Sequence, residues 1–408
     1  MMDDKNPICV SLLLTCMLFL SASFAANKNP YLLTEDTWKA LSRINKLLDT
    51  GQPEIAIEKL TKLLPQVQDK PYDESVVQQT LGYAWSTLGD HEAAIDAFRS
   101  ALNLNALPPD VTHDLEFNLA QLLIFTGKYK EGIKYLEHWI ESEQSPSLEA
   151  FILAATAYYE MRQYDKAIPY AKNVLTLKDK YDETWYQLLL ACYLKTNQYQ
   201  QAALLLEDMI QIQPDNPSYW QQLLAVWQHA NNDKKTLATY ELMLARGMLS
   251  NDDIKQLINM YLYLDLPYKA AKLLESKIAD GEFPKESRNY ELLGNAWLQA
   301  KELEKSAMAF VQAAKLSSDG NLYWRAGQIY FEMENYPQAI LYLRKALAKG
   351  KLKHHAQAEL LLGIALFHQK DYPHAQKAFE FALHNNSTRD QAEWWLQRIK
   401  DLDEKHSS

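Results

Sequence analysis

The histidines of this chain are the residues whose number and grouping first suggest chemistry. Six of the ten lie in the last 55 residues, and imidazole is a common ligand of zinc and other transition metals. They are His354, His355, His368, His374, His384 and His406. None has a second histidine four residues away or a neighbouring cysteine pair, the spacings that identify a metal site in a sequence. We therefore expect surface histidines and no bound metal.

Groups for catalysis are not apparent either. The chain has no nucleophile motif, no glycine-rich phosphate loop and no carboxylate pair in a credible setting. Cys192 lies in an expected helix beside Tyr193, a context that favours a buried small residue over a reactive thiol. We predict that the protein is not an enzyme and uses neither a cofactor nor a small-molecule substrate.

A cluster of basic residues, which we call the basic strip, interrupts an otherwise acidic chain. It consists of Arg344, Lys345, Lys349, Lys351 and Lys353. No acidic residue occurs between Asn335 and Ala358, although the whole chain has a net charge of −10. One interpretation is structural, with lysines placed against the negative end of a helix dipole. The alternative is a docking patch for an acidic partner or a lipid head group.

These residues are set on a repeat that spans almost the whole chain. A small residue recurs ten times, at spacings between 33 and 38 residues: Ala56, Ala94, Gly132, Ala167, Ala202, Thr236, Ala270, Ser306, Ala339 and Ala375. Four residues after each comes a mostly large apolar residue, and nine residues before each comes an aromatic residue or a leucine. A period of this length indicates a stack of similar units rather than a globule.

Each unit is predicted to be a helical hairpin. Two helical patterns flank a short polar turn, such as Gly89-Asp90 in the second repeat. Pro169 lies inside a second helix, where we expect an irregularity. After the tenth repeat, apolar residues from Ala392 to Leu402 follow a helical period and predict a capping helix. The predicted divisions are a signal peptide (1–25), an extension (26–36), a ten-repeat array (37–388) and a capping helix with tail (389–408).

Three stretches resemble the tetratricopeptide repeat family. They are LGYAWSTLGDHEAAIDAFRSAL from Leu81, LLGNAWLQAKELEKSAMAFVQAA from Leu292 and LLGIALFHQKDYPHAQKAFEFAL from Leu361. The resemblance covers nearly all of the chain after the leader. It implies an all-α, right-handed superhelical solenoid of about ten helical hairpins with a C-terminal capping helix, whose inner surface binds proteins or peptides.

A narrower resemblance is confined to the second half. YLYLDLPYKAAKLLESKI from Tyr261, DGNLYWRAGQIYFE from Asp319 and QAEWWLQRI from Gln391 are similar to secreted repeat proteins associated with TonB energy-transduction systems of Gram-negative bacteria. This similarity implies a periplasmic location and partners among envelope proteins.

The first helices carry a second apolar stripe, offset by one residue, or about 100°, from the packing stripe. By the family resemblance, this stripe lines the groove where ligands lie, and we expect Trp324, Phe331 and Phe367 to lie clear of their own second helices. Its members are Phe117, Ile124, Phe125, Trp324, Phe331, Leu360, Ile364 and Phe367. For any one of them, packing between neighbouring first helices is an equally good interpretation; for the set, binding is favoured.

Three polar residues occupy positions where some family members clamp a terminal carboxylate. They are Lys255, Asn259 and Arg325. Two further positions of that clamp hold Leu292 and Asn321 instead, which favours coincidence over a complete clamp. The three residues remain candidates for polar contacts with a partner.

The N-terminal residues predict the location. An apolar run from Ile8 to Leu20 is followed by small residues at positions 23 and 25, as in a cleaved secretory signal. The acidic residues before the run leave an uncleaved inner-membrane anchor as the alternative, although the run is short for a membrane span. We expect a periplasmic protein that meets the membrane only through partners. The acidic net charge argues against nucleic acid as a ligand.

Together these features predict a periplasmic scaffold that binds a protein or peptide of the bacterial envelope, as a component of a TonB-dependent transport system. Two alternatives remain. One is a holdase-like assembly factor for outer-membrane or secreted proteins, and the other is an accessory subunit of a polysaccharide-export complex.

Overall fold

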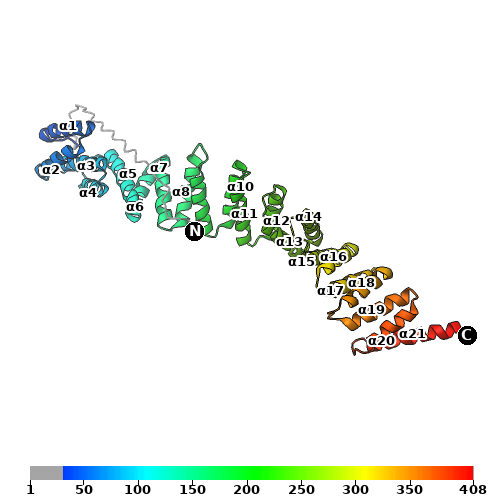
Figure 1. The fold of residues 1–408 in the computed structure, drawn as a ribbon. Helices are drawn as coiled ribbons and strands as arrows, with labels where there is room; N and C mark the ends of the chain where they lie inside the picture. The colour runs from blue at the N-terminus through cyan, green and yellow to red at the C-terminus, as the bar shows by residue number, and fades with distance from the viewer. Residues whose placement is uncertain (1–30, 408) are drawn as a thin grey trace. The chain divides into compact units, whose positions relative to one another are not determined.

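The computed structural model describes residues 31–407, and this part of the chain is all helical (Figure 1). It contains 21 α-helices, with one 3-10 turn at Leu64–Gln66, joined by short loops. The helices form two compact units: unit 1 ends at Asp215 and unit 2 begins at Asn216. The expected signal peptide, residues 1–25, lies outside the described residues.

Unit 1 is a series of five hairpins. They are α1 (Glu35–Asp49) with α2 (Pro53–Leu63), α3 (Pro71–Leu88) with α4 (His91–Asn103), α5 (Pro109–Phe125) with α6 (Tyr129–Ser142), α7 (Leu148–Glu160) with α8 (Tyr164–Leu177), and α9 (Glu183–Lys195) with α10 (Tyr199–Ile212).

Unit 2 continues the pattern with five more hairpins and a terminal helix. They are α11 (Pro217–His229) with α12 (Asp233–Ala245), α13 (Asn251–Tyr263) with α14 (Pro267–Ala279), α15 (Ser287–Gln299) with α16 (Leu303–Leu316), α17 (Asn321–Glu332) with α18 (Tyr336–Lys349), α19 (His355–His368) with α20 (Tyr372–Ala382), and α21 (Arg389–Ser407). The predicted fold class, an all-α solenoid of stacked hairpins closed by a terminal helix, is confirmed.

Each hairpin turn contains one residue with positive φ, always five positions before the repeated small residue. The ten are Gly51, Gly89, Gly127, Arg162, Asn197, Asn231, Asp265, Lys301, Glu334 and Lys370. This left-handed conformation ends the first helix and reverses the chain. Only three of the ten are glycine, so most turns pay a small conformational strain that the packing of the two helices must offset.

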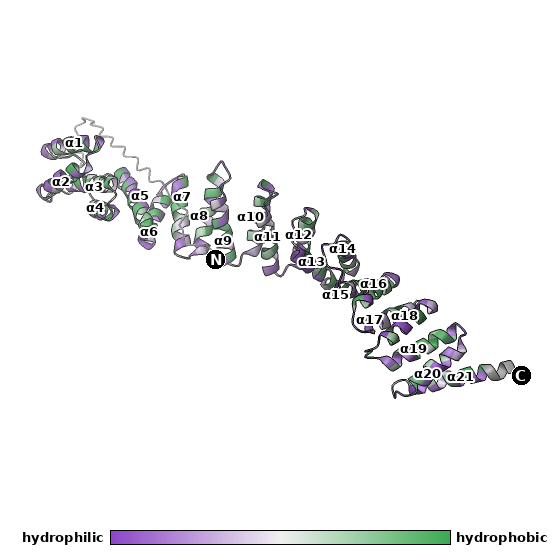
Figure 2. Ribbon diagram, viewed as in Figure 1, coloured by the Kyte–Doolittle hydropathy of each residue, from purple (hydrophilic) through white to green (hydrophobic). Residues whose placement is uncertain are grey.

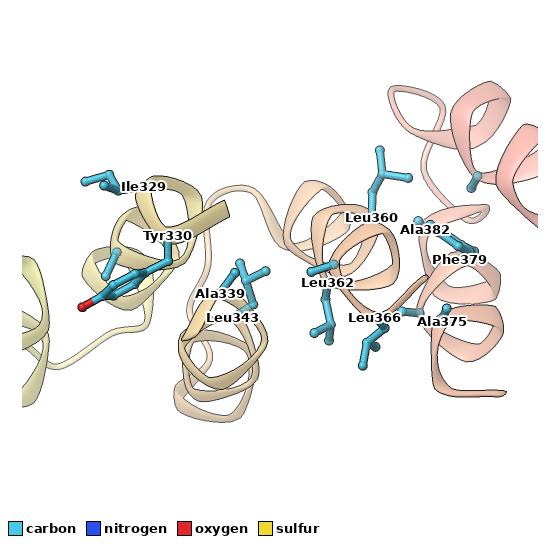
Figure 3. Close-up of a cluster of buried hydrophobic side chains, with 14 of the residues drawn as sticks. Ile329, Tyr330, Ala339, Leu343, Leu360, Leu362, Leu366, Ala375, Phe379 and Ala382 are labelled. Atoms are coloured by element: carbon cyan, nitrogen blue, oxygen red, sulfur yellow. The ribbon is translucent and has the colours of Figure 1, made fainter. Parts of the chain in front are cut away.

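The small residues bring the paired helices together. All ten are buried, and so are all ten residues that follow them by four positions, which confirms the packing stripe. Where the residue four positions later is a large phenylalanine, the first helix has a glycine opposite it. A Cβ atom built on Gly82 would lie 2.3 Å from the Phe98 ring, and one on Gly363 would lie 2.6 Å from the Phe379 ring. Figure 3 shows Phe379 in the buried cluster of unit 2, near Ala375 and Ala382.

Lysine side chains cover the aromatic residues at the ends of several first helices. In four repeats, the residue immediately before the small residue is a lysine whose Nζ lies 4.5–5.6 Å from the centre of the ring eight positions earlier: Lys166 over Tyr158, Lys235 over Trp227, Lys269 over Tyr261 and Lys305 over Trp297. A cation over an aromatic face contributes about 0.5–2 kcal/mol, depending on its exposure.

One of these pairs also links neighbouring hairpins. Tyr261 of α13 donates a hydrogen bond of 2.9 Å to Glu241 of α12, and Lys269 of α14 lies 2.8 Å from the same carboxylate. Burial, together with the bond to Glu241, raises the pKa of Tyr261 above its usual value, so this hydroxyl stays a donor at neutral pH.

The expected irregularity at Pro169 is not present, and that prediction is wrong. Helix α8 runs unbroken from Tyr164 to Leu177 with Pro169 as its sixth residue. A proline this close to a helix start removes only one backbone hydrogen bond, and the packing of Ala167 and Ala171 on either side holds the helix together.

The terminal helix α21 covers the last hairpin as predicted. Ala392 and Ile399 are buried, and the Trp395 indole stacks on the Phe379 ring with centres 5.8 Å apart and planes 6° from parallel. The helix thus closes an apolar end that a further repeat would otherwise cover.

Hydrophilic residues occur on helices of both units, as Figure 2 shows, and apolar residues alternate with them. This is the pattern of helices that each bury one face. Among residues 31–407, no helix combines the length and apolar character needed to span a membrane.

Replacing Gly363 with alanine is expected to destabilise the hairpin α19/α20, because the added Cβ overlaps the Phe379 ring. Overpacking costs about 1–3 kcal/mol, whereas the gain in helix propensity is about 1 kcal/mol. Gly294 is the matched control, since its Cβ would lie 3.0 Å from the Phe310 ring. Hydrogen exchange should accelerate in α19 and α20 for Gly363→Ala and change little for Gly294→Ala. Equal acceleration of hydrogen exchange in the two variants would contradict the view that Gly363 is required by the size of the Phe379 ring.

Deleting α21 from Gln391 onward is expected to expose Phe379 and to accelerate hydrogen exchange first in α20 and α19. Hairpins that do not contact α21 should keep their protection, because each repeat is stabilised mainly by its neighbours. A uniform loss of protection throughout unit 2 would contradict the view that each repeat is stabilised by its neighbours.

Candidate partner-binding site

The eight predicted groove residues fall on three first helices. Phe117, Ile124 and Phe125 lie on α5 in unit 1, whereas the other five lie on α17 and α19 in unit 2. The two groups belong to different units.

Three of the unit 2 residues line a single hollow, which we call the α17/α19 hollow. Trp324 of α17 and Leu360 and Ile364 of α19 contribute to its wall, and its volume is about 410 Å³. The remaining lining residues are Gln328, His354, Gln357, Leu361 and Gln391. The offset stripe of the ninth and tenth repeats therefore converges on one place, at the side of the first helices.

The lining of this hollow combines apolar side chains with polar ones. Its apolar part comes from one indole and three aliphatic side chains, and its polar part comes from three glutamines and one histidine. No aspartate, glutamate, lysine or arginine lines it. A glutamine amide both donates and accepts hydrogen bonds, so this lining suits the N–H and C=O groups of a peptide backbone.

Phe331 and Phe367 do not line the hollow, and the expectation that they lie clear of their own second helices is wrong. The Phe331 ring meets Tyr336 at the start of α18, with ring centres 5.7 Å apart. The Phe367 ring meets Tyr372 at the start of α20 at 5.3 Å, and Trp395 of α21 at 4.9 Å. A tyrosine at the first position of each second helix reaches back to these rings and uses them for packing.

The unit 1 residues differ from one another in exposure. Ile124 is buried, and Phe117 packs on Trp139 of its own second helix, with ring centres 4.5 Å apart. Phe125 is 54% exposed and meets only the edge of His91, at 5.0 Å. Of the three, Phe125 alone keeps most of its side chain accessible to a partner.

Two of the three polar candidates make contacts within the chain. Lys255 Nζ lies 2.9 Å from Asp252, and the Arg325 guanidinium lies 5.1 Å from the centre of the Phe310 ring. Asn259 is exposed on α13. Since α13 and α17 are separated in the stack by the hairpin α15/α16, Lys255 and Arg325 do not lie on adjacent first helices. Their role in polar contacts stays a prediction.

The basic strip has a partly structural role. Lys349, in the last turn of α18, donates a hydrogen bond of 2.5 Å to the Ala314 carbonyl near the end of α16. Lys345 lies over the Tyr342 ring at 5.2 Å. These contacts agree with lysines that satisfy helix carbonyls and cover aromatic rings.

The histidines are dispersed. His374 bonds to Asp371 at 2.7 Å, and His368 stacks on Tyr336 with ring centres 4.5 Å apart. Within residues 31–407, no three His, Cys, Asp or Glu side chains are grouped as metal ligands would be. Cys192 is fully buried, as predicted, and burial raises the pKa of its thiol to about 12.

A second hollow was not anticipated from the sequence. This α14/α16 hollow has a volume of about 270 Å³ and lies on the side of the second helices. Its lining includes Ile278, Leu293 and Met308, with Glu275, Lys285 and Lys305 among its polar residues. Met308 is an apolar residue at a solvent-facing position and is 55% exposed. This residue is the signal in the sequence that could have indicated the α14/α16 hollow.

The fold defines a class of protein, an all-helical solenoid of stacked hairpins. Family models described as tetratricopeptide repeat match residues 77–106, 117–145, 158–226 and 325–389. These four segments of the chain are therefore similar to tetratricopeptide repeats.

Similar proteins share its repeats. Over 149 residues the chain is 29% identical to protein O-mannosyl-transferase TMTC1 of Homo sapiens. The matched segment is 35% of this chain and 16% of that protein. A tetratricopeptide repeat protein from Parabacteroides merdae is 14% identical, with 60% of this chain and 93% of that chain covered and a TM-score of 0.32. The P58(IPK) TPR domain is 16% identical, with coverages of 91% and 99% and a TM-score of 0.26. The low TM-scores carry no information about function.

Replacing Trp324 with alanine is expected to leave unit 2 folded, because this side chain is half-buried at the wall of the hollow. Trp297, which is 1% exposed, is the matched control, and its truncation should cost about 3–5 kcal/mol. Phe367→Ala should resemble Trp297→Ala, since two helices cover its ring. Urea denaturation followed by circular dichroism distinguishes them. If Trp324→Ala loses as much stability as Trp297→Ala, the indole is part of the core and not of a binding wall.

Proposed function

We propose that this chain is a periplasmic scaffold whose α17/α19 hollow binds an extended segment of an envelope protein. The observation that carries the proposal is the convergence of Trp324, Leu360 and Ile364 on one hollow with an amide-rich lining. Its volume of about 410 Å³ lies within the range of about 300–1,000 Å³ that ligand sites occupy.

The lining selects the kind of segment. An apolar side chain entering the hollow removes its own surface and that of Trp324, Leu361 and Ile364 from water. A charged side chain would lose hydration there without gaining an opposite charge. Gln328 and Gln391 hydrogen-bond the backbone of the bound segment, which adds orientation to the apolar contact. A rim of this kind favours selective recognition over the weak binding of many apolar segments expected of a holdase.

The location and the cellular system rest on sequence features. The apolar run from Ile8 to Leu20 supports export to the periplasm. The stretches from Tyr261, Asp319 and Gln391, which resemble TonB-associated repeat proteins, support a role in TonB-dependent transport. Two of these three stretches, those from Asp319 and Gln391, contribute Trp324, Gln328 and Gln391 to the hollow.

Site-specific crosslinking in intact cells tests the proposal. A photoreactive amino acid in place of Gln357, at the rim of the hollow, should capture one envelope protein on irradiation. The same amino acid in place of Gln376, exposed on α20, is the control and should capture none. Sequencing the N-terminus of the recovered chain should show that it begins near Ala26.

Variants of the hollow complete this test. Leu361→Asp introduces a charge into the hollow and should remove the crosslinked product, while Gln328→Ala should reduce it without affecting folding. Equal capture from positions 357 and 376, or capture that survives both variants, would show that the partner docks elsewhere. An intact leader in the membrane fraction would contradict cleavage near Ala26 and indicate a membrane anchor.

A further inference from the structure

The loop between α18 and α19, residues 350–354, lies at the edge of the α17/α19 hollow. His354, at the end of this loop, is one of the lining residues. Asn321, the first residue of α17, holds the loop through its side-chain amide: its Nδ2 donates to the Lys351 carbonyl at 3.3 Å, and its Oδ1 accepts from the Lys353 N–H at 3.1 Å. Because Trp324 lies one turn further along α17, the loop and the indole are held by the same helix end.

Further contacts fix the path of this loop. The Gly320 N–H donates to the Gly350 carbonyl at 2.9 Å, and both Gly350 and Lys351 have positive φ values, of 75° and 54°. A Cβ atom on Gly320 would lie 2.2 Å from the Ala346 carbonyl oxygen, so α18 and the start of α17 are in direct backbone contact. Lys351 and Lys353 therefore extend from a fixed loop.

These two lysines differ from the rest of the basic strip. Lys345 lies over the Tyr342 ring, and Lys349 donates a hydrogen bond to a helix carbonyl. The positive charge of Arg344 is close enough to Asp371 to contribute to the lowered pKa of that carboxyl, which is lowered chiefly by the hydrogen bond to His374. Within residues 31–407, the side chains of Lys351 and Lys353 form no ion pair and lie over no aromatic ring. Both residues are exposed. They are cations available to a ligand.

Neither lysine forms an ion pair with a carboxylate of the described residues. Asp319 accepts a hydrogen bond of 2.9 Å from the Asn321 backbone N–H at the start of α17. Glu359 of α19 is half-buried, and burial raises the pKa of its carboxyl above the usual value. One end of an uncharged hollow thus has an excess of positive charge.

We infer that the protein segment bound in the α17/α19 hollow carries carboxylates where it leaves the hollow over the loop 350–354. The segment has an apolar side chain for the hollow and, next to it, aspartates or glutamates for Lys351 and Lys353. This inference rests on the proposed function and specifies the class of partner.

The number and setting of the free cations favour a protein over a membrane or a nucleic acid. Anionic membranes are bound by clusters of about 4–8 basic residues, whereas only two lysines of the strip are free here. A nucleic acid would be repelled by a chain of net charge −10. A short acidic segment matches two lysines beside an apolar hollow.

Selection from a random-sequence peptide library on the whole chain tests the inference. The expected products contain an apolar residue followed or preceded by acidic residues. Changing the acidic residues of a selected peptide to their amides should weaken binding about two- to tenfold at low salt, the effect of one or two exposed ion pairs. In the variant Lys351→Gln with Lys353→Gln this difference should disappear. The matched control, Lys272→Gln with Lys377→Gln, removes the same charge from other exposed positions and should retain it.

The outcomes separate this inference from the function on which it rests. Selected peptides that are neutral, and that lose binding in Trp324→Ala and Leu361→Asp, would overturn the acidic segment and leave the hollow as the site. Peptides that bind equally well to Trp324→Ala and Leu361→Asp would overturn both. If the chain sediments with phosphatidylglycerol vesicles through Lys351 and Lys353 and selects no acidic peptide, a membrane replaces the protein segment.

Discussion

Close approach between paired helices is the constraint on which this structure depends. Two helix backbones come together only where side chains at their crossing are small, and each of the ten hairpins has a buried small residue at that point. The residue one turn later, which is large in nine of the ten hairpins, then fills the space that the crossing leaves. Where it is phenylalanine, as at Phe98 and Phe379, the first helix supplies a glycine opposite it.

The hollow is a consequence of how much of each first helix this packing consumes. The first helix meets its own second helix along one stripe and neighbouring hairpins along others, so only a narrow strip is left for a partner. On α17 and α19 the strip includes Trp324 and Ile364, whose side chains remain half-buried. A binding surface of this origin is as rigid as the packing beneath it, which reduces the entropy lost when a partner binds.

The sequence predicted the hairpins well because their signal is repeated. A small residue that recurs ten times in phase determines the position of every helix pair, even where one repeat, such as that of Thr236, matches poorly. The lining of the hollow was predicted in part. Trp324, Leu360 and Ile364 follow from the offset stripe, but Phe331 and Phe367 share its periodicity and are covered by Tyr336 and Tyr372.

The remaining features depend on contacts that no periodic pattern contains. His354 belongs to a loop, and Gln391 belongs to the terminal helix, so neither is on the stripe that indicated the other residues. The distinction between engaged and free lysines in the basic strip is of the same kind. Spacing shows that the charges are near one another, but the bond from Lys349 to Ala314 joins residues 35 positions apart.

The position of Gln391 also bears on how such a protein can change length. Internal hairpins contact only their neighbours, so an array can gain or lose one of them and still bury its apolar faces. The last hairpin is different, because α21 both seals the array and supplies Gln391 to the hollow. A duplication placed between α20 and α21 would move the cap away from α17 and leave that hollow without one of its walls. An insertion before α17 would leave the walls of the hollow in place, whereas an insertion between α17 and α21 would separate them.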